Sequence, residues 1–470
     1  MLEYYWFDIN LRYGEIIMQL MLKDKKFYKS LVNIALPITL QNLVMSSVNM
    51  LDTLMITRLG DANIAAVGLA NQVFFFFSLI LFGVNSGSSI FVAQFWGKKD
   101  VKNIRRILGL AIIICGAVSI IFTIGALFIP ETLMNVFTHE KDVVELGVKY
   151  LKIIALSYLV TAVSFAYNTA LRSIGQAKVP MFISVVALVV NGTFNYLLIF
   201  GKFGFPRMEI EGAALATLIA RVVELILVLY ITYRSKNALA GRVNELIDVS
   251  KDFVIKYFKT AFPVIVNEFF WSLGTVLYSV AYARIGKEAT SAIQIANTVQ
   301  NFFLVFSRGL SSACAVMIGN KIGEGSKEDA VSYARTFIII GPILGVILGI
   351  ILFVFTPLIM TLFDTVSSAV YDYTVKALMV ISATMSIKII NGLLIVGIFR
   401  SGGDTRFSMF LEMGSVWLVG VPMAFFGALV LKVPVYMVLA LVSLEEVVKA
   451  IIGIPRLISN KWVRNVVEHM

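Results

Sequence analysis

The sequence predicts an all-α integral membrane protein, with twelve transmembrane helices in two pseudo-symmetric six-helix lobes around a central cleft. Three observations predict it: the composition, the number of long apolar runs, and an internal repeat. The 470 residues are 59% hydrophobic and 15% charged, with a mean hydropathy of +0.86. A soluble protein would carry about 25% charged residues. The composition therefore places the chain in a membrane.

The apolar runs give the number of spans. A helix needs about 20 predominantly apolar residues to cross a hydrocarbon core of about 30 Å. Runs of this kind cover residues 31–56, 63–96, 107–129, 144–170, 179–200, 211–233, 257–283, 289–319, 336–359, 370–398, 407–430 and 434–455.

The chain also repeats itself. When it is slid along itself until Pro37 falls on Pro263, Gly60 falls on Gly286, and with a nearly equal shift "LRSIGQAK" matches "FRSGGDTR". Six spans separate the two copies, so both have the same orientation and should be related by an axis along the membrane normal, as in parallel-repeat transporters. The expected domains are a cytoplasmic tail (1–29), an N-lobe (30–233), a linker (234–256), a C-lobe (257–456) and a second tail (457–470).

Basic residues predict the orientation. With the N-terminus inside, the inside segments contain 26 lysines and arginines and the outside segments contain 7. Positive residues accumulate on the cytoplasmic side of membrane proteins, so both termini are expected in the cytoplasm of a cell-membrane protein. The net charge of +11 is then a topogenic signal and a lipid-facing fringe, not a surface for nucleic acid.

Polar residues lie on one face of the first and seventh spans. Span 7 carries Glu268, Ser272, Thr275 and, further on, Tyr282. A charged group in mid-membrane costs about 2.5–3.5 kcal/mol, so ionisable residues in spans usually face a wet cavity. The small polar residues could instead mediate helix packing. The corresponding face of span 1 carries Asn42, Asn49 and the adjoining Asp52.

Three further spans carry candidate cavity-lining residues. Lys388 lies deep in span 10 and needs a counter-charge, for which Glu268 is the first candidate and Asp52 the second. The asparagines of span 5 either join neighbouring helices or line the N-lobe interior. The remaining candidates are Asn191 and Asn195 on span 5, Gln294, Asn297 and Asn301 on span 8, and Asn391 on span 10.

Other features suggest no separate site. Glu224 with Arg221, and Glu445 and Glu446 with Lys449, are expected to form local helix pairs near cytoplasmic ends. Two cysteines and two histidines offer neither a disulfide framework nor a metal site. Because no ATPase motif is present, active transport would draw on an ion gradient and no cofactor is expected.

Three motifs carry a family resemblance that covers nearly all of residues 30–460. "MLDTLMITRLG" on span 1, "NGTFNYLLIFGKFG" on span 5 and "GIFRSGGDTR" after span 10 resemble the MATE family, multidrug and toxic compound extrusion. The resemblance implies a V-shaped, twelve-helix antiporter. Such a protein exports amphipathic, often cationic, compounds against an inward flow of H⁺ or Na⁺.

The resemblance also implies roles for single residues. The family's span 1 aspartate matches Asp52, and the span 7 glutamate that couples the cation in one branch matches Glu268. Another branch has a second aspartate on span 5, where this chain has Asn195, and the glutamate-bearing branch has an aspartate on span 10 near Lys388. A lysine ammonium can replace a bound sodium ion electrostatically, which favours H⁺ as the coupling ion.

Other functions stay open on the sequence alone. The main alternative is a flippase for a lipid-linked or amphipathic substrate. A channel is possible in principle, but the unequal polar content of the lobes suits alternating access better. An intramembrane enzyme would need a catalytic set that the spans do not show, so no enzymatic activity is expected. The expected partners are the lipid bilayer and an amphipathic or cationic small molecule, and the chain is expected to be a monomer.

Overall fold

The chain packs into two units of helices. A computed structural model describes residues 24–363, 366–468 and 470, and within these ranges it contains no strand. The N-terminal unit holds Leu36–Phe269, and the C-terminal unit holds 24–35 with 270–468. The domain boundaries expected from the repeat stay a prediction, and the expected tail over 1–29 lies within the described residues only from residue 24 onward.

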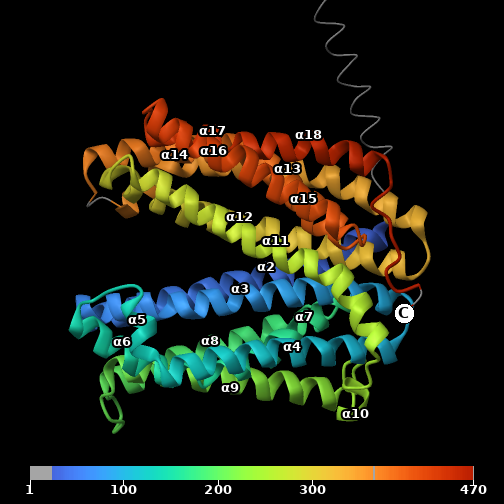
Figure 1. Cartoon of the computed structure of the whole chain (residues 1–470), viewed down its shortest axis with the longest axis horizontal. Helices are drawn as coiled ribbons and strands as arrows, with labels where there is room; N and C mark the ends of the chain where they lie inside the picture. Colours follow the sequence, from blue (N-terminus) through green and yellow to red (C-terminus); the bar gives the residue numbers. More distant parts are fainter. Residues whose placement is uncertain (1–23, 364–365, 469) are drawn as a thin grey trace, which may run out of the picture. The chain divides into compact units, whose positions relative to one another are not determined.

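The N-terminal unit is a bundle in which α3 packs on α4, α6 and α7, and α8 packs on α9 (Figure 1). A stacked pair of rings, Phe77 on Tyr158 at 4.9 Å, lies in its core. Its elements are α2 (Lys25–Ile56), η1 (Thr57–Leu59), α3 (Asp61–Gly97), α4 (Val101–Phe128), α5 (Pro130–Asn135), α6 (Lys141–Ile154), α7 (Ser157–Ser173), α8 (Lys178–Phe200), α9 (Glu209–Arg234), α10 (Val243–Leu246) and α11 (Lys251–Ala283), whose last part belongs to the C-terminal unit.

The C-terminal unit is built around α12, α13 and α14, which pack on one another, with α17 and α18 against α14. The start of α2 also belongs to it, since Phe27 packs on Tyr333 and Phe337. Its further elements are α12 (Lys287–Gly323), α13 (Lys327–Met360), η2 (Thr361–Phe363), α14 (Ser368–Gly392), η3 (Leu393–Arg400), α15 (Thr405–Ser415), η4 (Val416–Gly420), α16 (Val421–Phe425), η5 (Phe426–Val430), α17 (Val435–Val442) and α18 (Leu444–Ile458).

The structure divides two of the predicted spans. Among the described residues, ten helices are long and apolar enough to cross a membrane. An eleventh span is possible if α6 and α7 form one, with a bend of 51° between them. Residues 434–455 form two shorter helices that meet at Ser443. The membrane character of the prediction is therefore supported, while the count of twelve stays a prediction.

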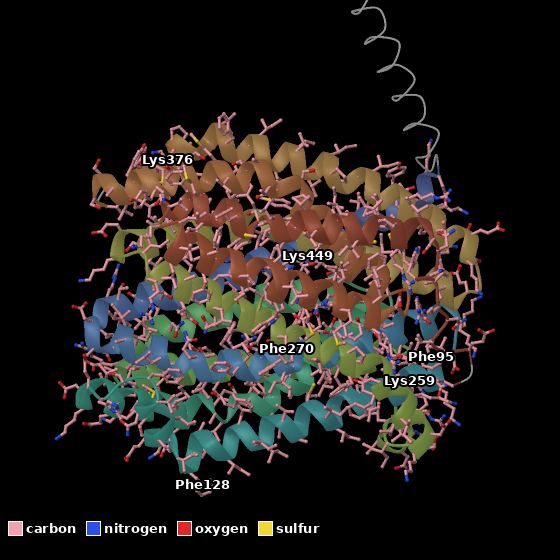
Figure 2. All side chains as sticks on the ribbon, turned by 45° about the horizontal axis from the view of Figure 1, so that its top comes forward. Phe95, Phe128, Lys259, Phe270, Lys376 and Lys449 are labelled. Atoms are coloured by element: carbon pink, nitrogen blue, oxygen red, sulfur yellow. The ribbon has the colours of Figure 1, made fainter. Side chains whose placement is uncertain are left out.

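Helix α13 packs on a neighbouring helix with one face and exposes apolar side chains on the other. Gly345 and Gly349 lie against the backbone of Ser386 and Ser382 on α14, where a Cβ atom would overlap it. Small residues let two helix backbones approach closely in a membrane. The other face of α13 is exposed and apolar, with Ile343, Val346, Ile347, Ile350, Phe353 and Val354. Phe128 likewise projects away from the ribbon at the end of α4 (Figure 2).

Two loops that correspond in the repeat are each held by a hydrogen bond from the segment that follows the last long helix of their half of the chain. Asn237, after α9, donates to Gln176, after α7, at 2.5 Å. The segment 459–467 after α18, here called the C-terminal tail, contacts the loop after η3 through the amide of Arg464 and the carbonyl of Gly402 at 2.7 Å. Asp404, which occupies the place of Gln176 in the second copy of the repeat, is buried. The glycine-rich "FRSGGDTR" segment therefore anchors the tail.

Candidate functional site

A cavity of about 480 Å³ lies inside the C-terminal unit. Binding sites for small molecules have volumes of about 300–1,000 Å³, so it could hold a drug-sized compound. Its walls come from α11, α12, α14, η3, α15, α17 and α18. Part of the wall is apolar, with Trp271, Val276, Leu304, Ile395, Val396, Leu439 and Val442.

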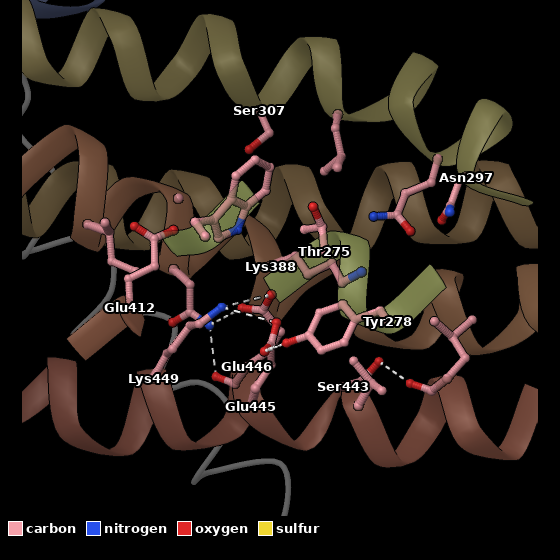
Figure 3. A pocket seen from close by; sticks show the side chains of 18 of the residues that line it. Thr275, Tyr278, Asn297, Ser307, Lys388, Glu412, Ser443, Glu445, Glu446 and Lys449 are labelled. Atoms are coloured by element: carbon pink, nitrogen blue, oxygen red, sulfur yellow. Dashed lines mark hydrogen bonds and ion pairs between the residues drawn. The ribbon is translucent and has the colours of Figure 1, made fainter. Parts of the chain in front are cut away.

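A cluster of charged side chains forms one end of this cavity (Figure 3). The Lys449 ammonium lies 3.3 Å from a Glu445 carboxylate oxygen and 3.5 Å from one of Glu446. All three residues are on α18, spaced so that they share a face. Only 4% of the Lys449 side chain is exposed, so the ion pairs are shielded from solvent. The sequence analysis expected this local pair, but the pair also lines a cavity.

Neighbouring helices complete the hydrogen bonds of the two glutamates. The Tyr278 hydroxyl on α11 donates to Glu445. Asn391 Nδ2 on α14 donates to a carboxylate oxygen of Glu446 at 2.7 Å and to its carbonyl oxygen at 2.8 Å. Gly420 lies so close to Tyr278 and Glu445 that a Cβ atom there would overlap both. Three helices and a glycine thus hold the carboxylates in place.

Two further cations line the same cavity. Lys388 forms neither an ion pair nor a hydrogen bond within the described part of the C-terminal unit, and it interacts electrostatically at longer range with Glu446 and Glu445. Arg308 donates a single hydrogen bond, to Asn301 at 3.2 Å. Glu412, also in the lining, is paired with Arg400 at 3.0 Å.

Backbone irregularities lie beside the cluster. Lys388 and Asn391 lie near the C-terminal end of α14, and the π-helical segment η3 begins two residues after Asn391. The break between α17 and α18 at Ser443 also lines the cavity. Short π-helical segments occur frequently at functional sites, because the altered backbone turns side chains in new directions.

The N-terminal unit holds a second polar network, centred on Asp52 of α2. Its carboxylate accepts a hydrogen bond from Asn195 of α8, which also donates to Asn191 at 3.1 Å. Asn191 in turn donates to Thr217 of α9 at 3.4 Å. The two asparagines are buried, so this carboxylate is held by amide groups and not by a fixed ion pair. Arg221 acts on Asp52 electrostatically at longer range.

The two polar centres occupy matching places in the repeat. The shift that places Pro37 on Pro263 also places Asp52 on Tyr278, and each connects the first helix of its half of the chain to a later helix of the same unit. The partner helices differ, because Asp52 bonds to α8 and Tyr278 bonds to α18. The expected pair of Arg221 and Glu224 is present at 2.8 Å, with Asn168 donating to the same glutamate at 2.9 Å.

The candidate residues from the sequence fall into three groups. Lys388, Thr275, Tyr282, Asn297 and Asn391 line the cavity of the C-terminal unit. Asp52, Asn191 and Asn195 form the network of the N-terminal unit. The others are Glu268 and Ser272, both buried on α11, Asn42, half-buried on α2, Gln294 and Asn301, exposed on α12, and Asn49, whose side chain lies outside those described.

Part of the cavity lining is not among the residues predicted from the sequence. Glu445, Glu446 and Lys449 were assigned to a local pair, and Tyr278 was not selected. The rule that singled out Glu268, an ionisable residue inside an apolar run, applies equally to these three residues of the 434–455 run. The spacing of residues within a single helix could not show that these three residues and Lys388 line the same cavity. The pairing of Lys388 with Glu268 stays a prediction.

Long apolar helices around buried polar clusters are typical of membrane transport proteins, and the comparisons with known proteins identify the family. The MatE family model matches residues 37–197 and 263–426, one segment in each half of the chain. The chain therefore belongs to the MatE family, whose members are multidrug efflux transporters of small molecules and not enzymes.

Bacterial relatives carry names that agree with this family, and a solved structure shares the fold. The chain is 25% identical to the probable multidrug resistance protein YoeA of Bacillus subtilis, over 85% of this chain and 86% of that protein. It is 24% identical to the probable multidrug resistance protein NorM of Thermotoga maritima, over 84% of this chain and 85% of that protein. An outward-facing structure of a multidrug resistance MATE family transporter matches with a TM-score of 0.84 at 19% identity. That match covers 94% of this chain and 99% of the other. It shows the fold alone.

Proposed function

We propose that this chain is a secondary antiporter that exports amphipathic, often cationic, small molecules in exchange for H⁺ by alternating access. It acts in the cell membrane as a monomer with twelve spans, and both termini face the cytoplasm. Membership of a multidrug efflux family and the relatives' names support the export of small molecules. The excess of basic residues in the expected inside segments supports the orientation.

The observation that carries the proposal is the charged cluster in the cavity of the C-terminal unit. Ionisable groups are expensive inside a membrane and mark ion or substrate pathways there. Glu445 and Glu446 share one cation, Lys449, and each has a further hydrogen-bond donor. Such carboxylates can gain or lose a proton while their positions are kept by the surrounding donors.

The same geometry favours H⁺ over Na⁺. A bound Na⁺ would need several carboxylate or carbonyl oxygens directed at one point, as hard cations do. The oxygens of Glu445 and Glu446 already accept from Lys449, Tyr278 and Asn391. Lys388 adds a second fixed positive charge to the lining. A proton can enter this arrangement without displacing any of these partners.

We assign the coupling role to Glu268, Asp52 and Lys388. Glu268 and Asp52 are carboxylates inside long apolar helices, one buried and the other held by Asn195. Each is therefore a candidate group to take up and release a proton. Lys388 is the fixed cation that makes a bound Na⁺ unnecessary.

The test is efflux of dye from proteoliposomes under an imposed gradient. Two amphipathic dyes are used, ethidium as the cation and 8-anilinonaphthalene-1-sulfonate as the anion, with either a pH gradient or a Na⁺ gradient. We expect efflux of at least one dye to follow the pH gradient and to stop when an ionophore collapses it. Efflux that follows only the Na⁺ gradient would reject H⁺ coupling, and movement without any gradient would indicate a channel or a flippase.

Substitutions separate the coupling residues from structural ones. Glu268→Gln and Asp52→Asn keep the shape of each side chain and remove its charge, so we expect each to abolish or strongly reduce proton-driven efflux. Glu288→Gln is the matched control, because it makes the same chemical change at an exposed glutamate in the first turn of α12 that is not part of the cavity lining. Undiminished coupling in Glu268→Gln would remove Glu268 from the mechanism.

A further inference from the structure

We infer that the cavity of the C-terminal unit binds amphipathic compounds through a carboxylate group, which pairs with the free ammonium of Lys388. The inference rests on the proposed export function and names the substrate class of one site. It follows from the charges in the lining, their pairing, and the direction of the Lys388 side chain.

Each carboxylate of the lining has a cation as a direct neighbour. Glu445 and Glu446 share Lys449, and Glu412 is paired with Arg400. Adding Lys388 and Arg308 gives four cations against three carboxylates, which leaves one unit of positive charge. Charges interact strongly in a low-dielectric interior, so an excess cation there attracts an anion and repels a second cation.

Lys388 is the cation with no direct partner in the lining. It forms no ion pair or hydrogen bond within the described part of the C-terminal unit. In Figure 3 its ammonium points away from Lys449, toward the side of the cavity where Thr275 and Asn297 lie. The glutamates of the cluster act on it only at longer range, and the side chain is part of the cavity lining.

The rest of the lining suits an amphipathic body attached to that carboxylate. Trp271 and the apolar residues of α11, α12 and η3 supply a hydrophobic wall. Thr275 and Asn297 offer neutral hydrogen-bonding groups beside the ammonium. Arg308 adds positive charge on α12 and makes only one hydrogen bond, to Asn301. A flat hydrophobic acid would place its ring on the wall and its carboxylate on Lys388.

Binding to the full-length protein in phosphatidylcholine nanodiscs tests the inference. The probes are biphenyl-4-carboxylate, its neutral carboxamide and biphenyl-4-methylammonium, which share one apolar body, and empty nanodiscs correct for partition into lipid. Hydrogen bonds to charged groups contribute about 1.5–3 kcal/mol. We therefore expect Lys388→Met to weaken carboxylate binding by about tenfold or more, with little effect on the carboxamide.

Two variants separate loss of charge from loss of folding. Lys388→Arg should keep most of the preference for the carboxylate. Lys376→Met lies on the same helix, α14, but removes a lysine that is paired with Asp372 outside the cavity, so it should bind as the wild type does. Equal binding of carboxylate and carboxamide by the wild type, tighter binding of the methylammonium, or an unchanged preference in Lys388→Met would each overturn the inference.

Fluorescence places the probe. A 4′-iodinated biphenyl-4-carboxylate should quench tryptophan emission, and Trp271→Phe should remove most of that quenching. Quenching that is unchanged in Trp271→Phe would place the ligand elsewhere and reject this site. Because none of these measurements uses an ion gradient, failure of H⁺ coupling and failure of carboxylate binding are observed separately.

Discussion

Replacing Lys449 by methionine tests whether its ion pairs with Glu445 and Glu446 stabilise the C-terminal unit. The substitution keeps the length of the side chain and removes the cation that lies 3.3 Å from Glu445 and 3.5 Å from Glu446. The exposed fractions of the three side chains are 4%, 9% and 13%, so water cannot replace the lost cation. Removing one member of a buried ion pair costs about 3–5 kcal/mol.

The control is a lysine with the same spacing in a wet environment. Lys376 is 2.7 Å from Asp372, also four residues away, but their side chains are 44% and 53% exposed. Exposed pairs of this kind contribute about 0.3–0.5 kcal/mol. Lys376→Met should therefore be nearly neutral, while Lys449→Met should lower the free energy of unfolding by several kcal/mol (Figure 2 labels both).

The assay is reversible unfolding in mixed micelles, with steric trapping as a second measurement of the same free energy. Adding Glu445→Gln to Lys449→Met should recover part of the loss, because it removes one of the two carboxylates left without their cation. Coupling within such a network is typically about 0.5–3 kcal/mol. Equal stability of Lys449→Met and Lys376→Met, or no recovery in the double variant, would refute the reasoning.

Three further predictions follow from other contacts. Gly420→Ala should cost about 1–3 kcal/mol and weaken efflux, because its methyl group would displace a hydroxyl and a carboxylate, whereas Gly414→Ala on the same span meets no atom within 4 Å and should be neutral in the same unfolding assay. Asp404→Asn should loosen the C-terminal tail, because Asp404 pairs with Arg464 of the tail at 3.0 Å and with Arg456 at the end of α18 at 2.7 Å, and faster trypsin cleavage in the tail with unchanged cleavage elsewhere would show it. The hydrogen bond from the Arg242 amide, with help from a nearby arginine, lowers the pKa of Glu245 from 4.5. A depressed pKa stabilises the folded form above the unfolded value. The docking of α10 should therefore be lost as the pH falls below about 4.5. Protection factors for the amides of that helix, which are corrected for the intrinsic pH dependence of exchange, would contradict this if they stayed constant between pH 3 and 7.

The membrane character and the repeat were readable from the sequence because both depend on local composition. Apolar runs of sufficient length must be helices in a bilayer, where every backbone group has to bond within its own segment. The two segments matched by the family model begin at Pro37 and Pro263, the two prolines that the repeat superimposes. Part of the buried network around Asp52 could also be expected from the sequence, since Asn191 and Asn195 are four residues apart on one helix face.

The packing of neighbouring helices decides where a helix is interrupted. The 434–455 run is apolar enough to suggest one continuous span, yet the chain breaks at Ser443 and a second helix begins at Leu444. The sequence also offered no sign of the π-helical segments η3, η4 and η5. Backbone geometry of this kind depends on what the neighbouring helices offer, as at Gly420 beside Tyr278.

By itself the sequence determined that this chain is a helical membrane protein with a duplicated plan, and that it keeps costly ionisable groups inside its spans. Only the tertiary structure decided which of these groups meet. Spacing along one helix shows that Lys449 can reach Glu445 and Glu446. The rotation of that helix against its neighbours brings Tyr278 to Glu445 and Asn391 to Glu446. That rotation is set by close contacts between helices far apart in sequence, so the cavity and the free ammonium of Lys388 emerge only when the helices are packed.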